Sequence, residues 1–381
     1  MTNGTEKWRV KHQQIISYEV VNSYNLFHPQ NPSLLSAGKG NGARRFVVVD
    51  HYVYEKYSEK IREYFHFNEV EAKIIPFRGG EDNKTVESYL SIVRELDAFP
   101  IHRRDEPILA IGGGVLTDTI GFVASTYRRG VPHIKIPTTL MGYIDASIGI
   151  KTGINFDEYK NRLGSFSPPK MVLLDRSLLG TLPRRHILNG VCEIIKLAII
   201  KDLQLFQMLE ADGAYSVDTF FQDERGGAIL DRAITGMLEE LEPNLFEEEL
   251  ARKVDFGHTF SYGLETHHEA HLLHGEAVLL DIVLSVLIAK NRNLISNEET
   301  GRIFQLIDAL GIVLNTSVLD PQTLWESLDE RTYHRNRQQR VPLPNGLGEC
   351  VFVNDICRDE VELSLKNLED WITVKHDHNI K

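Results

Sequence analysis

Cysteine is scarce in this sequence. The chain of 381 residues has Cys192, Cys350 and Cys357, spaced too irregularly for a disulfide framework or a cysteine-based zinc site. Cys192 stands inside the apolar stretch GVCEIIKLAII, where we expect a buried thiol rather than a nucleophile. The opening residues MTNGTEKWRV lack the apolar core of a secretory signal, so we expect a cytoplasmic protein.

Long apolar runs and an excess of basic residues are also missing. The apolar stretches are broken too soon to span a bilayer, which argues against a membrane protein. Lysine and arginine number 42 against 54 acidic residues, and the net charge of −12 argues against nucleic-acid partners. With 42% hydrophobic and 25% charged residues the composition is that of a globular protein, and its length favours two domains.

Short apolar runs alternate with helical spacing in the first half of the chain. Residues 44–50 and 73–77 are predicted strands, and the amphipathic segment 54–65 between them is a predicted helix. Further strands are predicted in EPILAIGG, HIKIPTTL and KMVLLD (170–175). This alternation is typical of a parallel sheet covered by helices on both faces. After TLPRRH (181–186) the spacing becomes helical, which places a boundary near residue 180.

Three glycines at 112–114 follow a predicted strand and precede an Asp-bearing helical segment. Such a turn lets backbone N–H groups approach a pyrophosphate, although glycine clusters also form plain tight turns. Asp118 would lie a turn into the helix. Asp50 could accept from a ribose hydroxyl or simply cap a helix, and Thr138 and Thr139 end another strand beside the same crevice. The pattern favours a dinucleotide site.

Five cations lie close in sequence to this predicted nucleotide site. They are Arg128, Arg129, Lys151, Lys160 and Arg162. In a chain of net charge −12 such a concentration is unusual. A phosphorylated substrate beside the nucleotide would explain it.

The helical half contains a possible metal site formed by Glu193, His258 and His274. Two imidazoles and one carboxylate leave open positions on a zinc-type cation. The alternative is that these are surface residues or helix caps, and the histidines of the nearby HHEAH run are competing ligands. Lys196 follows Glu193 by one helical turn, which would also suit an ordinary surface ion pair.

Several motifs follow one another along the chain: GGGVLTDTIGFVASTYRRG, IPTTLMGYIDASIGIKTGIN, KNRLGSF, TLP, NGVCEIIK, FGHTFSYGLE and HGEAV. In these motifs, and in their order, the chain resembles the dehydroquinate-synthase-like sugar phosphate cyclases from about residue 44 to 360. The resemblance implies an α/β plus α fold. It has an N-terminal Rossmann-like parallel-sheet domain (1–180) that binds NAD and a C-terminal α-helical domain (181–381) that binds metal and substrate, usually in a homodimer.

The resemblance also implies roles for individual residues. The NAD site would be lined by Asp50, Glu81, Lys84, Gly113, Gly114, Val115, Asp118, Thr138, Thr139, Asp145, Lys151, Lys160, Thr181 and Leu182. Glu193, His258 and His274 would hold one divalent ion, zinc or cobalt. The substrate and its phosphate would meet Lys151, Asn161, Lys196 and Arg129, with Asp145 also among the catalytic residues. The implied reaction is transient oxidation by NAD, loss of phosphate, re-reduction and an intramolecular aldol closure.

Four positions depart from the dehydroquinate synthase pattern. Asp255 replaces an Asn and Tyr262 a His, while Ala251 and Met237 stand where an Arg and a Lys are expected. Loss of two cations removes partners for a substrate carboxylate, which favours a sugar without one. The chain most resembles the branch of the family that acts on sedoheptulose 7-phosphate. Within that branch Asp255 and His334 resemble the pair of 2-epi-5-epi-valiolone synthases.

Other functions remain open from the sequence. Within the superfamily these are the synthases of 2-epi-valiolone, desmethyl-4-deoxygadusol and 3-dehydroquinate. A metal-dependent polyol dehydrogenase shares a GGG-containing nucleotide domain, and a catalytically silent homologue could act as a binding module. The cation set around KTGIN and KN argues against the dehydrogenase. The intact Lys151, Lys160 and Lys196 argue against a silent homologue. His186 stands where relatives often carry an acidic residue.

Overall fold

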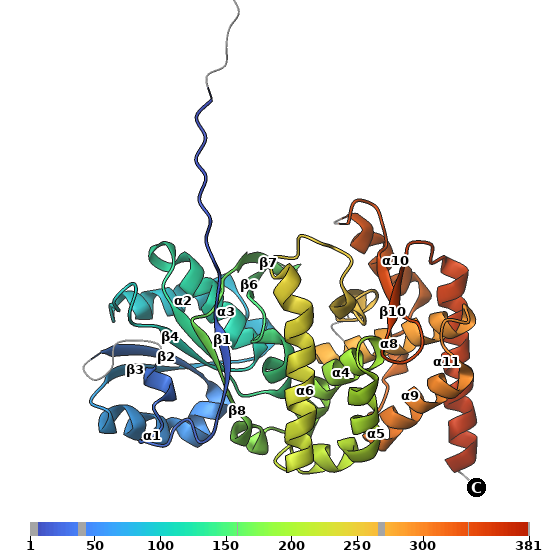
Figure 1. Cartoon of the computed structure of the whole chain (residues 1–381), viewed down its shortest axis with the longest axis horizontal. Helices are drawn as coiled ribbons and strands as arrows, with labels where there is room; N and C mark the ends of the chain where they lie inside the picture. The colour runs from blue at the N-terminus through green and yellow to red at the C-terminus, as the bar shows by residue number, and fades with distance from the viewer. Residues whose placement is uncertain (1–6, 37–42, 158, 266–270, 334, 380–381) are drawn as a thin grey trace, which may run out of the picture.

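The computed structural model describes residues 7–36, 43–157, 159–265, 271–333 and 335–379. A layer of strands and helices formed by the first half of the chain lies beside a bundle of helices formed by the second half (Figure 1). Residues 7–18 extend away from this body before the first strand begins.

In the described part of the chain, six strands form one parallel sheet in the order β1-β8-β5-β4-β2-β3. Their bounds are β1 Glu19–Ser23, β2 Arg44–Asp50, β3 Glu71–Phe77, β4 Ile108–Gly112, β5 His133–Pro137 and β8 Met171–Asp175. The five predicted strands are confirmed. β1 escaped the prediction because EVVNS is short and only partly buried at the edge of the sheet.

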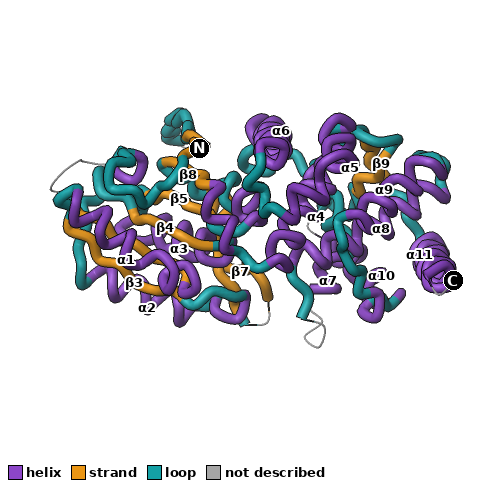
Figure 2. Tube along the Cα trace, turned by 90° about the horizontal axis from the view of Figure 1, so that it is seen from below, coloured by secondary structure: helices purple, strands orange, loops and turns teal. Residues whose placement is uncertain are grey.

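Helices cover both faces of this sheet (Figure 2). They are α1 (His51–Phe67), α2 (Val86–Asp97) and α3 (Gly114–Thr126). Because side chains alternate along a strand, Val47 and Val49 of β2 join the hydrophobic cluster of α1, whereas Phe46 and Val48 join the cluster of α2 and α3. The predicted doubly covered sheet is therefore confirmed.

The sheet register aligns the carboxyl ends of the central strands. Val49 of β2 pairs with Ile111 of β4, and Gly112 pairs with Pro137 of β5. Asp50, the glycine turn and Thr138 therefore follow neighbouring strands at one edge of the sheet. This edge is where open α/β sheets bind ligands.

A hairpin that the sequence analysis did not predict follows the sheet edge. Strands β6 (Lys151–Phe156) and β7 (Tyr159–Phe166) pair antiparallel, preceded by the π-helical turn η4 (Gly142–Ala146). Gly153 and Gly164 face each other, and a Cβ at Gly164 would lie 2.7 Å from the carbonyl oxygen of Thr152. The mixed polar composition of KTGINF and YKNRLGSF hid these strands.

The second half of the described chain is mainly helical. Its helices are α4 (Arg184–Ile200), α5 (Leu203–Asp218), α6 (Glu224–Leu241), α7 (Ser261–Glu265), α8 (His274–Asn291), α9 (Asn297–Ala309), α10 (Pro321–Tyr333) and α11 (Arg358–Asn379). A small hairpin of β9 (Val341–Pro344) and β10 (Cys350–Val353) lies among them. The last strand of the large sheet, β8, ends at Asp175, and the first helix of this half, α4, begins at Arg184. None of the described helices is long and apolar enough to cross a membrane.

The hydrophobic core of the helices continues into the first half of the chain. Leu140, Tyr143 and Ile144, from the segment around η4, belong to the same buried cluster as α4 and α8. Val172 and Leu174 of β8 join it as well. The junction between the two parts is thus packed rather than linked by an open connector.

Candidate functional site

The glycine turn brings the start of α3 close to its neighbours. A Cβ at Gly113 would lie 3.1 Å from Cγ2 of Thr139, and one at Gly114 would lie 3.0 Å from Cβ of Ala146. The first turn of α3, which includes Val115, begins here directly after β4 without a side-chain cap, and the first N–H groups of an α-helix have no partner within the helix. The structure therefore confirms the tight turn, and binding of a dinucleotide at these glycines stays a prediction.

Asp50 caps α1. Its side chain accepts from the backbone N–H of Tyr52 at 3.0 Å, so the predicted N-cap role is confirmed. Burial raises the pKa of the Asp50 carboxyl despite this hydrogen bond. Gly79 comes so near that a Cβ there would lie 2.5 Å from Oδ2 of Asp50. His186 lies close enough to influence the Asp50 carboxyl electrostatically. The predicted hydrogen bond from a ribose hydroxyl to Asp50 stays a prediction.

A buried lysine connects several of the predicted nucleotide residues. Nζ of Lys84, a residue only 3% exposed, donates to Oδ2 of Asp118 at 2.7 Å and to Oδ1 of Asn161 at 2.5 Å. Asn155 extends this network, because its side chain accepts from the Asn161 backbone and donates to Oε1 of Glu81 at 2.9 Å. Burial opposes the charge of Lys84, but Asp118 and Glu81 outweigh it and raise the pKa of Lys84.

Thr138 and Thr139 connect the end of β5 to its surroundings. The backbone N–H of Thr138 donates to the carbonyl of Gly112 at 3.0 Å. The hydroxyl of Thr139 accepts from the backbone N–H of Gly142 at 3.1 Å, at the start of η4. The structure thus gathers the predicted strand-end residues around the glycine turn.

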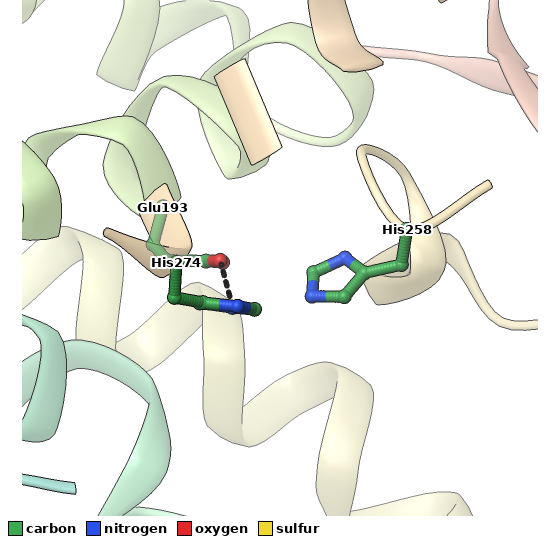
Figure 3. A group of neighbouring side chains, drawn as sticks. All are labelled: Glu193, His258 and His274. Carbon is green, nitrogen blue, oxygen red and sulfur yellow. Dashed lines mark ion pairs between the residues drawn. The ribbon is translucent and has the colours of Figure 1, made fainter. Parts of the chain in front are cut away.

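Glu193, His258 and His274 converge, as the sequence predicted. Each offers one ligand atom, and these atoms all lie within 4.8 Å of one another. Glu193 comes from α4, His258 from the loop before α7 and His274 from the first turn of α8. The two imidazole rings lie next to each other, with centroids 5.3 Å apart and planes tilted by 50° (Figure 3). The three side chains are therefore clustered rather than scattered, and their role as metal ligands stays a prediction.

The donor set fits a divalent cation. Glu193 is fully buried, its Oε2 pairs with Lys196, and its Oε1 lies 3.5 Å from Nε2 of His274, so the carboxylate is directed at the cluster (Figure 3). Nδ1 of His258 lies 3.2 Å from the carbonyl oxygen of Phe256, which leaves Nε2 free to bind a metal. Burial, together with Lys196, lowers the pKa of His258 to about 3, so its ring is neutral. A histidine that binds a metal must be neutral in this way. Burial opposes the charge of His274, but Glu265 and Glu193 raise its pKa to about 10 when no metal is bound, so metal binding would release a proton from this ring.

Lys196 forms an ion pair with Glu193, but not at the surface. Both side chains are buried, at 2% and 0% exposure, so the interpretation as a surface ion pair is wrong. Burial opposes ionisation of both groups. Lys196 outweighs it and holds the pKa of Glu193 below its usual range, while Glu193 and Asp145 raise the pKa of Lys196. Burial, reinforced by Glu193, raises the pKa of Asp145, which places Asp145 in the field of the same cluster.

Glu265, which the sequence analysis missed, joins the metal cluster to the sheet part. Its Oε1 lies 2.9 Å from Nδ1 of His274, and its Oε2 lies 2.8 Å from Nζ of Lys160 on β7. Burial opposes ionisation of Glu265, but His274 and Lys160 lower its pKa to about 2. Glu265 is the last residue of the FGHTFSYGLE motif, which also contains His258, and this position could have indicated a role at the site.

Asp255 is surrounded by three arginines that sequence reasoning also missed. Arg252 pairs with its Oδ1, while Oδ2 lies 2.7 Å from Arg335 and 3.3 Å from Arg331. Burial opposes ionisation of Asp255, but Arg252, Arg331 and Arg335 lower its pKa to about 2. Oε1 of Glu247, which also pairs with Arg252, lies 2.9 Å from Nζ of Lys151. The predicted substrate lysine is therefore linked to this arginine cluster.

Other predicted residues lie outside these clusters. Arg129 is exposed, and no ion pair joins it to another described residue. Thr181 follows β8 and lies 3.5 Å from the hydroxyl of Tyr57, and Leu182 comes next in the chain. His271 is exposed and absent from the described metal cluster. His267, His268 and His334 lie outside the described residues.

Cys192 is a buried free thiol, which confirms the sequence-based expectation. Its side chain is 1% exposed, and burial raises the pKa of the thiol. Met237 is fully buried in the hydrophobic core of the helices. The position where dehydroquinate synthase is expected to carry a lysine is therefore a core position in this chain.

The protein has an α/β plus α fold. Its parallel sheet carries a glycine turn of the kind that binds phosphates, and the adjacent helices carry a Glu-His-His cluster suited to a divalent metal. Two family models match this chain: 3-dehydroquinate synthase N-terminal over residues 74–189 and 3-dehydroquinate synthase C-terminal over residues 190–332. The chain belongs to the 3-dehydroquinate synthase family.

Several proteins of known name and one solved structure are similar to this chain over nearly its whole length. A 2-epi-5-epi-valiolone synthase from Streptomyces albus is 46% identical over 369 residues, which cover 95% of this chain and 90% of that protein. A demethyl-4-deoxygadusol synthase from Trichormus variabilis is 35% identical over 374 residues, with 96% and 91% covered. The solved structure of ValA, a 2-epi-5-epi-valiolone synthase from Streptomyces hygroscopicus subsp. jinggangensis 5008 with NAD⁺ and Zn²⁺ bound, matches with a TM-score of 0.91. It is 43% identical, and the match covers 95% of this chain and 99% of that one.

Proposed function

We propose that this protein is a sugar phosphate cyclase that converts sedoheptulose 7-phosphate to 2-epi-5-epi-valiolone with loss of phosphate. It would be a phosphate-eliminating carbon-oxygen lyase that acts as a cytoplasmic homodimer. The observation that carries the proposal is the convergence of Glu193, His258 and His274 beside Lys196. The names of the relatives that align over nearly the whole chain supply the reaction.

The cofactors are NAD and one divalent ion, zinc or cobalt. Glu193, His258 and His274 would hold the ion, and the residues around the glycine turn and Lys84 would hold the dinucleotide. When bound, the two cofactors would supply reversible hydride transfer and polarisation of a substrate hydroxyl, without net redox change. We infer that Lys196 and Asp145 would hold protons during the reaction, because Lys196 pairs with Glu193 and Asp145 lies in the field of the same carboxylate.

The substrate would be a phosphorylated sugar without a carboxylate. Lys151, Asn161 and Arg129 are the residues proposed to meet its phosphate, as the resemblance implies. Asp255 supports the absence of a substrate carboxylate, because this buried anion already occupies Arg331 and Arg335. A second carboxylate near these arginines would meet guanidinium groups whose charge is partly neutralised.

The assignment of the product rests on Asp255 together with His334. The synthases of 2-epi-valiolone, desmethyl-4-deoxygadusol and 3-dehydroquinate are the alternatives within the superfamily. Changing Asp255 to Ala and His334 to Thr together is expected to alter the product profile more than the affinity for NAD⁺. NMR of the products measures this, and an unchanged profile at a normal rate removes the reason for choosing among the heptulose cyclases.

The proposed function is tested by incubating the purified protein with NAD⁺, Zn²⁺ or Co²⁺ and each sugar phosphate. We expect phosphate release and a valiolone product from sedoheptulose 7-phosphate. Phosphate release only from the heptulosonate of the shikimate pathway would contradict the proposal. Net accumulation of NADH, followed by its absorbance at about 340 nm, would favour a polyol dehydrogenase. The variant His274→Ala should lose bound metal and turnover together.

A further inference from the structure

Asp281 is a buried carboxylate in the middle of the apolar helix α8. Its side chain is fully buried, seven residues after His274 on the same helix. Oδ2 of Asp281 accepts from the backbone N–H groups of Thr259 at 2.6 Å and Ser261 at 3.0 Å, and also from that of Phe260. One carboxylate oxygen thus binds three successive amides directly after His258.

The backbone before His258 also rests on α8. Gly257 has a φ of +78°, and a Cβ there would lie 2.8 Å from Cγ1 of Val278 and 3.0 Å from Cγ1 of Ile282. Positions 274, 278, 281 and 282 share one face of a helix that has 3.6 residues per turn. The loop is therefore held on both sides of His258 by the face of α8 that begins with His274.

A comparable contact fixes α4, which carries Glu193. The side chain of Asn189, one turn before Glu193, accepts from the backbone N–H of Gly275 at 2.7 Å. A Cβ at Gly275 would lie 2.0 Å from the Asn189 carbonyl oxygen, so α4 and the start of α8 are in close contact. Helix α8 is thus the element against which all three proposed ligands are placed, and Asp281 is its contact to the His258 loop.

We propose that Asp281 is a positioning residue of the metal site, which holds the loop 257–261 on α8 so that the imidazoles of His258 and His274 face the same cation. The proposal rests on the metal site of the proposed function. Asp281 touches no ligand side chain, so it acts through the backbone that carries His258. Its carboxylate needs these amides because an ionised group without partners is costly to bury.

The variant Asp281→Asn tests the proposal with Co²⁺ as the probe. Chelator-treated protein is titrated with Co²⁺ while the visible absorption of the ion is recorded, and urea unfolding of the metal-free protein and NAD⁺ binding are measured in parallel. We expect the Kd for Co²⁺ to rise about 10-fold to 100-fold with an altered spectrum, while the Kd for NAD⁺ changes less than about twofold. Asp281→Ala serves as a second variant if the Asp281→Asn protein does not fold.

Two controls separate positioning from general stability. Val283→Ala truncates another fully buried residue of α8 and should lower stability without changing the cobalt spectrum. Ser285→Ala removes the 3.1 Å hydrogen bond to Oδ1 of Asp281 but leaves the three amide contacts, so Co²⁺ affinity should stay near wild type. A wild-type cobalt spectrum and affinity in folded Asp281→Asn or Asp281→Ala overturns the proposal, as does an equal loss of affinity in Val283→Ala.

The variant His258→Ala distinguishes failure of this inference from failure of the proposed function. If His258→Ala loses Co²⁺ while the Asp281 variants bind it normally, only the positioning role is refuted. If His258→Ala also keeps its Co²⁺, the metal site is wrong and the role of Asp281 is refuted with it.

Discussion

Nδ1 of His274 lies 2.9 Å from Oε1 of Glu265. A carboxylate in this position fixes the orientation of an imidazole and raises its basicity as a metal ligand. The opposite oxygen of Glu265 contacts Lys160, which belongs to the hairpin of the sheet part. The orientation of one proposed ligand therefore depends on a residue from the other half of the chain.

Replacing Glu265 with Gln should weaken metal binding. The amide keeps the size of the side chain but loses the charge that His274 and Lys160 contact, so we expect zinc affinity to fall about 10-fold to 100-fold. Zinc retained after dialysis against graded chelator measures this. Glu298→Gln, at an exposed position in the first turn of α9, is the control and should retain wild-type zinc. Equal retention in both variants would contradict the role of Glu265.

Replacing Lys84 with Met should weaken NAD⁺ binding and leave metal binding intact. The change removes the cation that joins Asp118 to Asn161 and leaves the Asp118 carboxylate without its 2.7 Å partner. We expect the Kd for NAD⁺ to rise about tenfold, since loss of a charged hydrogen bond costs about 1.5–3 kcal/mol. Calorimetric titration measures it. Lys73→Met, which removes the 2.6 Å surface pair with Glu95, should bind NAD⁺ normally.

The stability contributed by Asp255 should depend on pH. Its folded-state pKa, about 2, lies below the value of about 3.9 in an unfolded chain. The contribution is therefore complete above pH 4 and is lost as the pH falls through the window from about 4 to 2. At pH 7, Asp255→Asn should lower the free energy of unfolding by about 3 kcal/mol, because three arginines lose a buried partner.

Urea unfolding of wild type and Asp255→Asn between pH 3 and 7 tests this expectation. The difference in unfolding free energy should narrow below pH 4. A difference that stays constant over this range would show that the ionised carboxylate is not its source.

Thiol labelling should distinguish the three cysteines. Cys357 is exposed and should react quickly in the native protein, whereas Cys192 is buried with a raised pKa and should react only on unfolding. Burial raises the pKa of Cys350 to about 11, so we expect slow reaction there. Mass spectrometry after timed alkylation reports each site, and early modification of Cys192 would contradict its burial.

Much of the fold could be predicted because apolar periodicity is strong where strands are buried on both faces. The strand at 44–50 has the predicted bounds, and the helix predicted at 54–65 extends over His51–Phe67. The hairpin of β6 and β7 could not be predicted in this way. Its pairing depends on two glycines that meet across the strands, and glycine leaves no hydrophobic pattern.

The metal ligands could be proposed from residue type and motif, but their supports could not. Glu265 and Asp281 act on residues 9 and 20–22 positions away, through contacts that exist only in the folded chain. The three arginines around Asp255 lie up to 80 residues from it. A lone aspartate inside the apolar run EAVLLDIVLSV was the strongest unused signal, because burying a charge requires partners.

The shared core across the junction has a consequence for how the chain can be divided. A fragment that stops near residue 180 would carry Leu140, Tyr143 and Ile144 without the helices that cover them. Those side chains would form an exposed apolar surface, which promotes self-association. The two halves should therefore melt as a single unit, and neither is suited to serve as an independent building block in a chimaera.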